Sequence, residues 1–202
     1  MFKRYDSQFL FSYGETDILG RFTQSEISSQ SILKSSAQRA IRSQLLEQLS
    51  INAETLEQIW PKKEPLILVK CKDRISLYVV NGEPLFFQQF DDQLYPTLRL
   101  VHKYPDILPR LQVDRGAIRH LLAGANMMCP GFTSAGGRLP PKEEALPAQK
   151  AIGIFCEGKE HAAGVGVLKL STEEIKKTTK GVGVEVKSYL GDGLWHMEKI
   201  GK

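Results

Sequence analysis

The pattern of apolar residues changes near Leu108, and this change divides the chain into two parts. Before it, apolar residues recur at helical spacing and are followed by runs of β-branched residues. After it, short strand-like runs are separated by closely spaced glycines. A chain of 202 residues is long enough for two small domains. We therefore expect an α+β protein with a domain boundary near residue 108.

The regular structure of the first part begins with two predicted helices. Apolar residues at every fourth position predict a helix over residues 33–49. Asn52 is a good N-cap for a second, short helix, which Pro61 ends. The preceding residues 7–31 contain scattered glycines and many serines, so we expect a flexible insertion there.

A β-hairpin and a third helix complete the first part. Residues 66–71 and 74–80 are rich in branched side chains, and Asn81-Gly82 is a strong turn signal before the next apolar run at 85–90. Pro96 suits the first turn of a short helix over 97–104. These elements predict an α/β domain over residues 1–108.

The second part has the sequence pattern of a small β-barrel. Asp114 is expected to cap a helix over residues 115–122 that Gly124 ends. Strands are predicted in 125–132, 151–158, 161–170, 182–190 and 193–197. Glycines inside strands indicate close approach of backbone. We expect the barrel to span residues 109–192, with a C-terminal strand and tail over 193–202 that closes onto the first domain.

Composition and charge narrow the class of protein. Lys and Arg number 27 against 23 Asp and Glu, a net charge of +4, which permits a nucleic-acid partner without requiring one. Cys71, Cys129 and Cys156 are far apart and odd in number, so we expect neither a disulfide framework nor a zinc site. No apolar run approaches the roughly 18 residues of a membrane span, and we expect no secretory signal.

No sequence motif predicts catalysis, a metal or a cofactor. The GVGV strings at 164–167 and 181–184 lack the ending of a phosphate-binding loop. The four histidines show no metal-ligand spacing, and Cys129 has no nucleophile signature around it. We expect neither a catalytic residue nor a small-molecule substrate.

The best binding candidate is the helix 115–122 with the loop that follows it. Arg115 and Arg119 are four residues apart, so an α-helix would project both from one face. From the residues alone, a solvated helix face explains them better than phosphate binding does, since most such charges belong only to the surface. Met127 and Met128 suit either a platform for a base or the two sides of a strand, and Trp195 suits a barrel core.

Several strings resemble a known family. The second part resembles a PUA domain in Asp114–Ile118, Gly124–Gly131, Glu157–Lys159, Gly164–Gly166, Lys180–Gly183 and Asp192-Gly193. The whole chain is similar to the malignant T-cell-amplified sequence family of translation-machinery-associated PUA proteins. The matching strings in the first part are Met1–Asp6, Pro61–Pro65, Val80–Glu83, Leu85–Phe87 and Tyr95–Pro105. Residues 7–31 and 136–150 are longer than the family pattern.

The resemblance implies a pre-PUA α/β domain followed by a PUA pseudo-β-barrel. It also implies a non-catalytic, cytoplasmic RNA-binding translation factor without cofactor, metal or membrane contact. Such a factor acts with a density-regulated-protein homologue on the small ribosomal subunit, in re-initiation and in tRNA release after termination. The RNA-binding residues expected on this basis are Arg115, Gly116, Arg119, Gly124, Ala125, Asn126, Met127, Met128, Pro130 and Gly131, with Arg99, His102 and Lys103 as a further set.

Two other functions remain open, and the partner surface is a separate expectation. A PUA protein of this size also suits a ribosome-assembly adaptor, and PUA domains accompany RNA-modification enzymes. The N-terminal domain is expected to bind the density-regulated-protein homologue through an apolar patch. The residues expected in that patch are Phe2, Phe9, Leu10, Phe11, Phe86 and Phe87.

Overall fold

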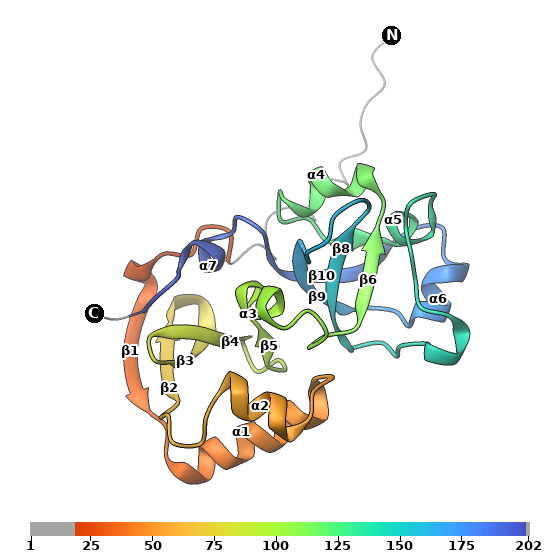
Figure 1. Ribbon diagram of the computed structural model, residues 1–202. Coiled ribbons are helices and arrows are strands. Elements are labelled where there is room, and N and C mark those ends of the chain that lie inside the picture. Colours follow the sequence, from red (N-terminus) through yellow and green to blue (C-terminus); the bar gives the residue numbers. More distant parts are fainter. Residues whose placement is uncertain (1–18, 201–202) are drawn as a thin grey trace.

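The computed structural model describes residues 19–200 and contains two five-stranded sheets (Figure 1). The first sheet has the order β1-β2-β3-β4-β5 and is antiparallel throughout. Its strands are β1 (Ile27–Ile32), β2 (Ile67–Cys71), β3 (Ile75–Val80), β4 (Glu83–Gln89) and β5 (Tyr95–Pro96). The helices of this part are α1 (Ser35–Gln48), α2 (Ala53–Ile59) and α3 (Leu98–Lys103).

Local hydrogen bonds explain where these helices begin. The Asn52 side chain accepts from the backbone N–H of Thr55 at the start of α2, as predicted. The Thr97 side chain does the same for Leu100 at the start of α3. Pro96 therefore lies in β5 and not in the first turn of the helix, which corrects the sequence-based placement.

The turn between β3 and β4 is the predicted hairpin. Asn81 and Gly82 both have positive φ, 52° and 79°. This is the backbone that a two-residue turn needs to match the twist of its strands.

The prediction of a flexible insertion over residues 7–31 is wrong for residues 19–31, the part that the structure describes. Residues 27–32 form β1, which pairs with β2. Leu19 and Phe22 are buried in the main core. Because β1 is mostly exposed, its backbone pairing with β2, and not side-chain packing, outweighs the low strand propensity of this serine-rich segment. Residues 7–18 lie outside the described part of the chain.

The second sheet has the order β6-β8-β9-β10-β7. Strands β6 (Arg110–Val113) and β8 (Ala151–Cys156) are parallel, and the other pairs are antiparallel. The remaining strands are β9 (Gly164–Leu168), β10 (Val182–Tyr189) and β7 (Met127–Met128). The Asp114 N–H donates to the Gly131 carbonyl at 2.8 Å, so the segment after β7 meets the end of β6. The sheet thus curls into an incomplete barrel.

A close approach of backbone explains the glycines of β9. A Cβ on Gly166 would lie 2.6 Å from a Val184 methyl group and 2.7 Å from the Glu185 carbonyl oxygen. Only glycine fits there without displacing β10, as the sequence predicted.

Four helices cover or extend the barrel: α4 (Ile118–Leu121), α5 (Cys129–Thr133), α6 (Thr172–Lys177) and α7 (Gly193–His196). Ser171 and Glu174 form a capping box at the start of α6. Two predicted strands are corrected. Within 125–132 only Met127 and Met128 form a strand and α5 begins at Cys129, and 193–197 contains α7. The buried side chain of Asp192 accepts from the Trp195 N–H and so caps α7 instead of leaving an extended chain.

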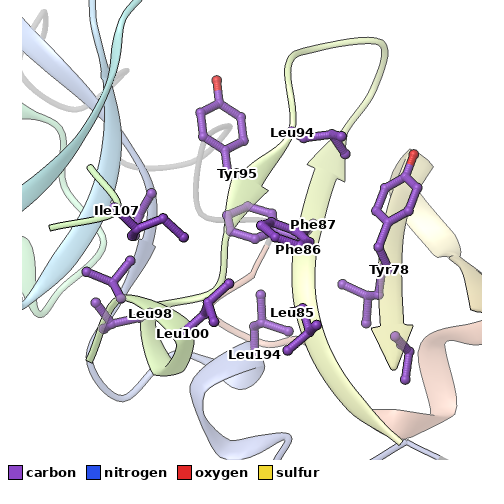
Figure 2. Packing of buried hydrophobic residues seen from close by; sticks show 14 of the residues in the cluster. Tyr78, Leu85, Phe86, Phe87, Leu94, Tyr95, Leu98, Leu100, Ile107 and Leu194 are labelled. Atoms are coloured by element: carbon purple, nitrogen blue, oxygen red, sulfur yellow. The ribbon is translucent and has the colours of Figure 1, made fainter. Parts of the chain in front are cut away.

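The tail docks on the first sheet, although not as a strand. The Ile200 N–H donates to the Gly82 carbonyl at 2.8 Å, and Leu194, Met197 and Ile200 are buried. The same core contains Phe155 and Val165 of the barrel and Leu98 of α3. Figure 2 shows Leu98, Leu100 and Leu194 gathered beside Leu85 and Phe86 of β4. One continuous core therefore spans both sheets.

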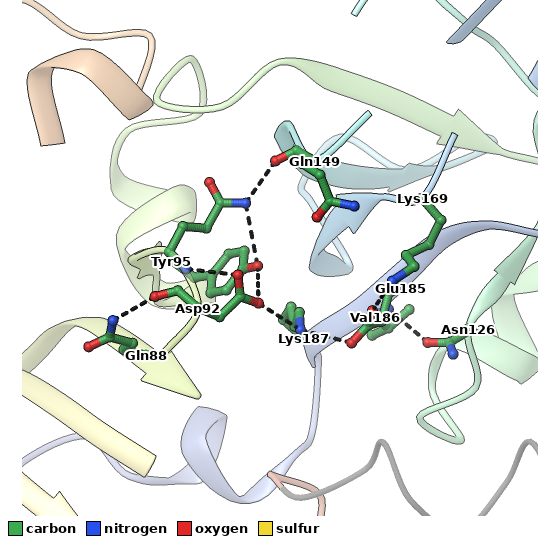
Figure 3. Close-up of polar contacts among 10 residues, drawn as sticks. Gln88, Asp92, Tyr95, Asn126, Gln149, Lys169, Glu185, Val186 and Lys187 are labelled. Atoms are coloured by element: carbon green, nitrogen blue, oxygen red, sulfur yellow. Dashed lines mark hydrogen bonds and ion pairs between the residues drawn. The ribbon is translucent and has the colours of Figure 1, made fainter. Parts of the chain in front are cut away.

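A polar network also joins the two parts (Figure 3). The Lys187 ammonium of β10 lies 3.0 Å from the Asp92 carboxylate and 2.8 Å from that of Glu185. The Tyr95 hydroxyl donates to Asp92 at 2.7 Å. Burial alone would raise the pKa of Asp92 and of Glu185. At Asp92 the hydrogen bonds from Tyr95 and Lys187 outweigh burial, and at Glu185 the hydrogen bond from Lys187 does so. The pKa of each carboxyl group therefore lies below its usual range. Burial would likewise lower the pKa of Lys187, yet its two carboxylate partners raise it.

Lys187→Met is expected to destabilise the protein more at pH 7 than at pH 4. At pH 7 the variant leaves the Asp92 carboxylate without its ion-pair partner and Glu185 with the exposed Lys169 alone, at a cost on the order of 3 kcal/mol. Depressed carboxyl pKa values stabilise the fold above the unfolded values near 4, and this contribution is lost as the pH falls through the folded values. In the variant, protonation at pH 4 relieves the unpaired charges. Urea unfolding at both pH values measures the difference.

Lys169→Met is the matched control, because Lys169 pairs with the same Glu185 but its side chain is 45% exposed. Its loss is expected to cost less than about 1 kcal/mol. Equal destabilisation by the two variants, or no pH dependence for Lys187→Met, would contradict the role assigned to the network.

Candidate nucleic-acid interface

The segment 114–122 places two exposed cations at one end of the barrel. The Asp114 side chain accepts from the Ala117 N–H at 2.9 Å and fixes the start of the segment, as predicted. Arg115 and Arg119 are both exposed, and neither makes an ion pair with any described residue within 4.0 Å. Both guanidinium groups are therefore available to an anionic ligand.

The segment is not the uniform α-helix that the sequence predicted. Residues Arg115–Ala117 form a 3-10 turn, and only Ile118–Leu121 (α4) is α-helical. The α-helical spacing that would put Arg115 and Arg119 on one face does not extend to Arg115. The Arg115 N–H donates to the Glu157 carboxylate at 3.1 Å, which ties this turn to the end of β8.

A side chain of the loop after α4 anchors this loop to the sheet. Gly124 has φ of 75°, which suits a chain reversal after a helix. The Asn126 side-chain oxygen accepts from the Val186 N–H of β10 at 2.9 Å. Asn126 thus fastens the loop to the sheet, and its carbonyl oxygen already has a partner.

Some residues of β7 and α5 are buried and others are exposed. Met127 is buried, whereas Met128 is 43% exposed, so the pair fills the two sides of a strand. Pro130 is exposed in α5, two residues after Met128. Among the predicted residues of this loop, Met128 offers the larger apolar contact to a ligand.

Arg99, His102 and Lys103 lie on a different surface, on α3 between the two sheets (Figure 1). Arg99 donates to the Trp195 carbonyl and pairs with Glu198, and Lys103 pairs with Glu83. His102 hydrogen-bonds the Ala162 carbonyl at 2.8 Å. Trp195 itself is half-buried against these α3 residues, so its expected place in the barrel core is wrong.

The described residues offer little for catalysis or metal binding. Within residues 19–200, no group of three or more His, Cys, Asp or Glu side chains is arranged to hold a metal ion. The three cysteines are free and buried. Burial raises the pKa of each thiol, that of Cys71 to about 11 with the charge of Glu26 adding to it, so the thiols are poor nucleophiles at neutral pH. No helix in the described part is long and apolar enough to cross a bilayer.

Comparison with known proteins defines the class. The Pre-PUA-like domain family matches residues 22–105, and the PUA domain family matches residues 109–190. The fold agrees with two archaeal structures at about one-fifth sequence identity. One is a hypothetical protein of Pyrococcus horikoshii (TM-score 0.67, 20% identity, covering 84% of this chain and 99% of that one). The other is a PUA-domain protein of Aeropyrum pernix (TM-score 0.65, 21% identity, 86% and 93%). The chain is therefore a pre-PUA and PUA protein.

Curated relatives are much more similar in sequence. Malignant T-cell-amplified sequence 1 of Rattus norvegicus is 51% identical over 180 residues, which cover 89% of this chain and 97% of the relative. Translation machinery-associated protein 20 of Saccharomyces cerevisiae is 46% identical over 176 residues, 87% and 96% respectively. The chain belongs to this family of translation-related PUA proteins.

Sequence reasoning missed the network around Lys187. Glu185 and Lys187 are two residues apart in a predicted strand, so their shared face could have been read from the alternation. Their partner Asp92 follows β4, and the sequence contains no sign that these segments meet.

Asn126→Ala is expected to destabilise the protein by about 1–3 kcal/mol, because the Val186 N–H would lose its acceptor in the barrel. Asn126→Asp keeps an oxygen at that position and is the matched control, with a smaller loss. Urea unfolding of both variants is the measurement. If Asn126→Ala unfolds like the parent protein, the anchoring role of this side chain is wrong.

Proposed function

We propose that this protein is a non-catalytic, cytoplasmic RNA-binding translation factor that uses the surface from Arg115 to Gly131. The observation that carries the proposal is the pair of exposed arginines, which have no ion-pair partner among residues 19–200, beside the partly exposed Met128. Phosphates need such cations, and unpaired bases need flat or apolar contacts.

The proposed site of action is the small ribosomal subunit, in re-initiation and in the release of tRNA after termination. Membership of a family with relatives named as translation machinery-associated proteins supports it. The exposed Met128 and Pro130 support contact with a structured RNA end, whereas Gly124 is buried and serves the chain reversal after α4. Asn126 contributes by shaping the loop, and its side-chain NH₂ is the group that would face RNA.

A double variant, Arg115→Ala/Arg119→Ala, tests the surface. Removing each cation that meets a phosphate should lower the slope of log affinity against log salt by about one unit and weaken binding to all RNAs alike. Binding to isolated small subunits and to tRNA at two salt concentrations is the measurement. Lys176→Ala/Lys177→Ala on α6 removes equal charge elsewhere and should change binding less. Unchanged RNA binding by the folded Arg115→Ala/Arg119→Ala variant would contradict this placement.

We further propose that the pre-PUA domain binds a density-regulated-protein homologue. The expected apolar patch needs correction, because Phe86 and Phe87 are fully buried core residues. Phe2, Phe9, Leu10 and Phe11 lie outside the described residues. The exposed apolar side chains of this domain, among the residues that the structure describes, are Ile32 on β1, at 68% exposure, Leu46 on α1 and Phe90 after β4.

Ile32→Ser is expected to weaken that interaction about tenfold or more if β1 is part of the interface, since a central apolar contact contributes one or more kcal/mol. Calorimetric titration of the full chain with the homologue is the measurement. Leu190→Ser is the control, an exposed apolar residue of the barrel. Loss of binding with Leu190→Ser and not with Ile32→Ser would place the partner on the PUA domain.

A further inference from the structure

A second concave site lies where α3, the start of β4 and the C-terminal tail meet. This pocket has a volume of about 390 Å³. Its lining combines three cations, two carboxylates and two aromatic rings, from Glu83, Arg99, His102, Lys103, Trp195, Glu198 and Lys199. It is separate from the Arg115–Gly131 surface, since it shares no residue with it.

Three flat side chains of this pocket lie close together at tilted angles, with the ring of His161 beside them. The Arg99 guanidinium lies 4.6 Å from the centre of the Trp195 ring. The His102 ring lies 5.1 Å from Trp195 and 5.3 Å from His161, which is exposed. Guanidinium planes and aromatic rings are the groups on which unpaired bases stack.

Hydrogen bonds hold Arg99 and His102 in place before any ligand binds. The Arg99 Nε donates to the Trp195 carbonyl at 2.9 Å, and a ring nitrogen of His102 hydrogen-bonds the Ala162 carbonyl. The side chain of Arg99 is 28% exposed, so its plane is fixed but still reachable. A preformed site binds with a smaller entropic cost.

Two carboxylates form ion pairs with two of the three cations of the pocket. Glu198 lies 3.1 Å from Arg99, and Glu83 lies 2.5 Å from Lys103. The side chain of Glu198 is 74% exposed, and such ion pairs contribute little to stability. Lys199 makes no ion pair with a described residue within 4.0 Å. A ligand with phosphates can therefore exchange with both carboxylates.

We propose that this pocket binds an unpaired nucleotide of single-stranded RNA. The base packs against Arg99 and Trp195 once Glu198 has moved off Arg99, and the flanking phosphates contact Lys199 and, in place of Glu83, Lys103. The proposal rests on the proposed function in that RNA is the ligand, but it assigns a second site and a different RNA conformation.

Intrinsic fluorescence gives a local signal for this site. Trp60 is fully buried in the first domain, and Trp195 is half-buried at the pocket. Titration of the full chain with a five-nucleotide uridine or adenosine RNA should quench the emission of Trp195. In Trp195→Phe the quench should disappear, and binding measured by fluorescence anisotropy of a labelled RNA should weaken severalfold, because the smaller ring offers a base less stacking area.

Charge variants test the exchange of anions. Lys103→Ala/Lys199→Ala should weaken the same RNA about tenfold and lower its salt slope by about 1.4 units. Lys62→Ala/Lys63→Ala, which removes two exposed lysines before β2, should change the affinity much less. Glu83→Gln/Glu198→Gln should tighten binding about fivefold. Glu143→Gln/Glu144→Gln makes the same change in net charge on an exposed loop and is the control.

The outcomes separate this proposal from the proposed function. If the parent protein binds RNA and the two Glu→Gln pairs, or the two Lys→Ala pairs, behave alike, the pocket is not the site. If only tRNA is bound, and only Arg115→Ala/Arg119→Ala reduces binding, the proposed function stands and the pocket proposal is overturned. If no RNA binds to the parent protein, both fail.

Discussion

The pairing of Lys187 with Asp92 and Glu185 is the interaction on which the joint between the two domains depends. Lys187 belongs to the barrel, and Asp92 follows β4 of the first sheet, so the ion pair links the two directly (Figure 3). A buried charge must keep its partners, because leaving it unpaired costs several kcal/mol. The network therefore fixes the register of one sheet against the other while the shared apolar core supplies most of the favourable free energy.

A rigid joint makes the two candidate RNA surfaces parts of one body. The Arg115–Gly131 surface belongs to the barrel alone, whereas the pocket at Trp195 is built from α3, the start of β4 and the tail. The tail crosses from the barrel to the first domain and ends its described part at the Gly82 carbonyl. Motion of the tail would disturb the pocket, because Arg99 of α3 donates to the Trp195 carbonyl of the tail.

Elements with strong local signals could be predicted from the sequence. The Asn81-Gly82 hairpin, the Asn52 cap and the capping box of α6 depend on neighbours in sequence. Elements decided by distant partners could not. Serines in β1 pair with β2, and Asp192 turns the expected last strand into α7. For the site, the exposure of Arg115 and Arg119 followed from the sequence, whereas the anchoring of Asn126 to Val186 needed the folded sheet.

The measurement that tests the central claim most directly is hydrogen exchange of the full chain with and without bound RNA. If one rigid body carries both surfaces, RNA should slow exchange in 115–131 and also in 99–103 and 193–199, with β8 and β9 unchanged. Protection confined to segments outside both surfaces, such as α1 and α2, would contradict the account. Faster exchange along β10 on binding would contradict the rigid joint at Lys187.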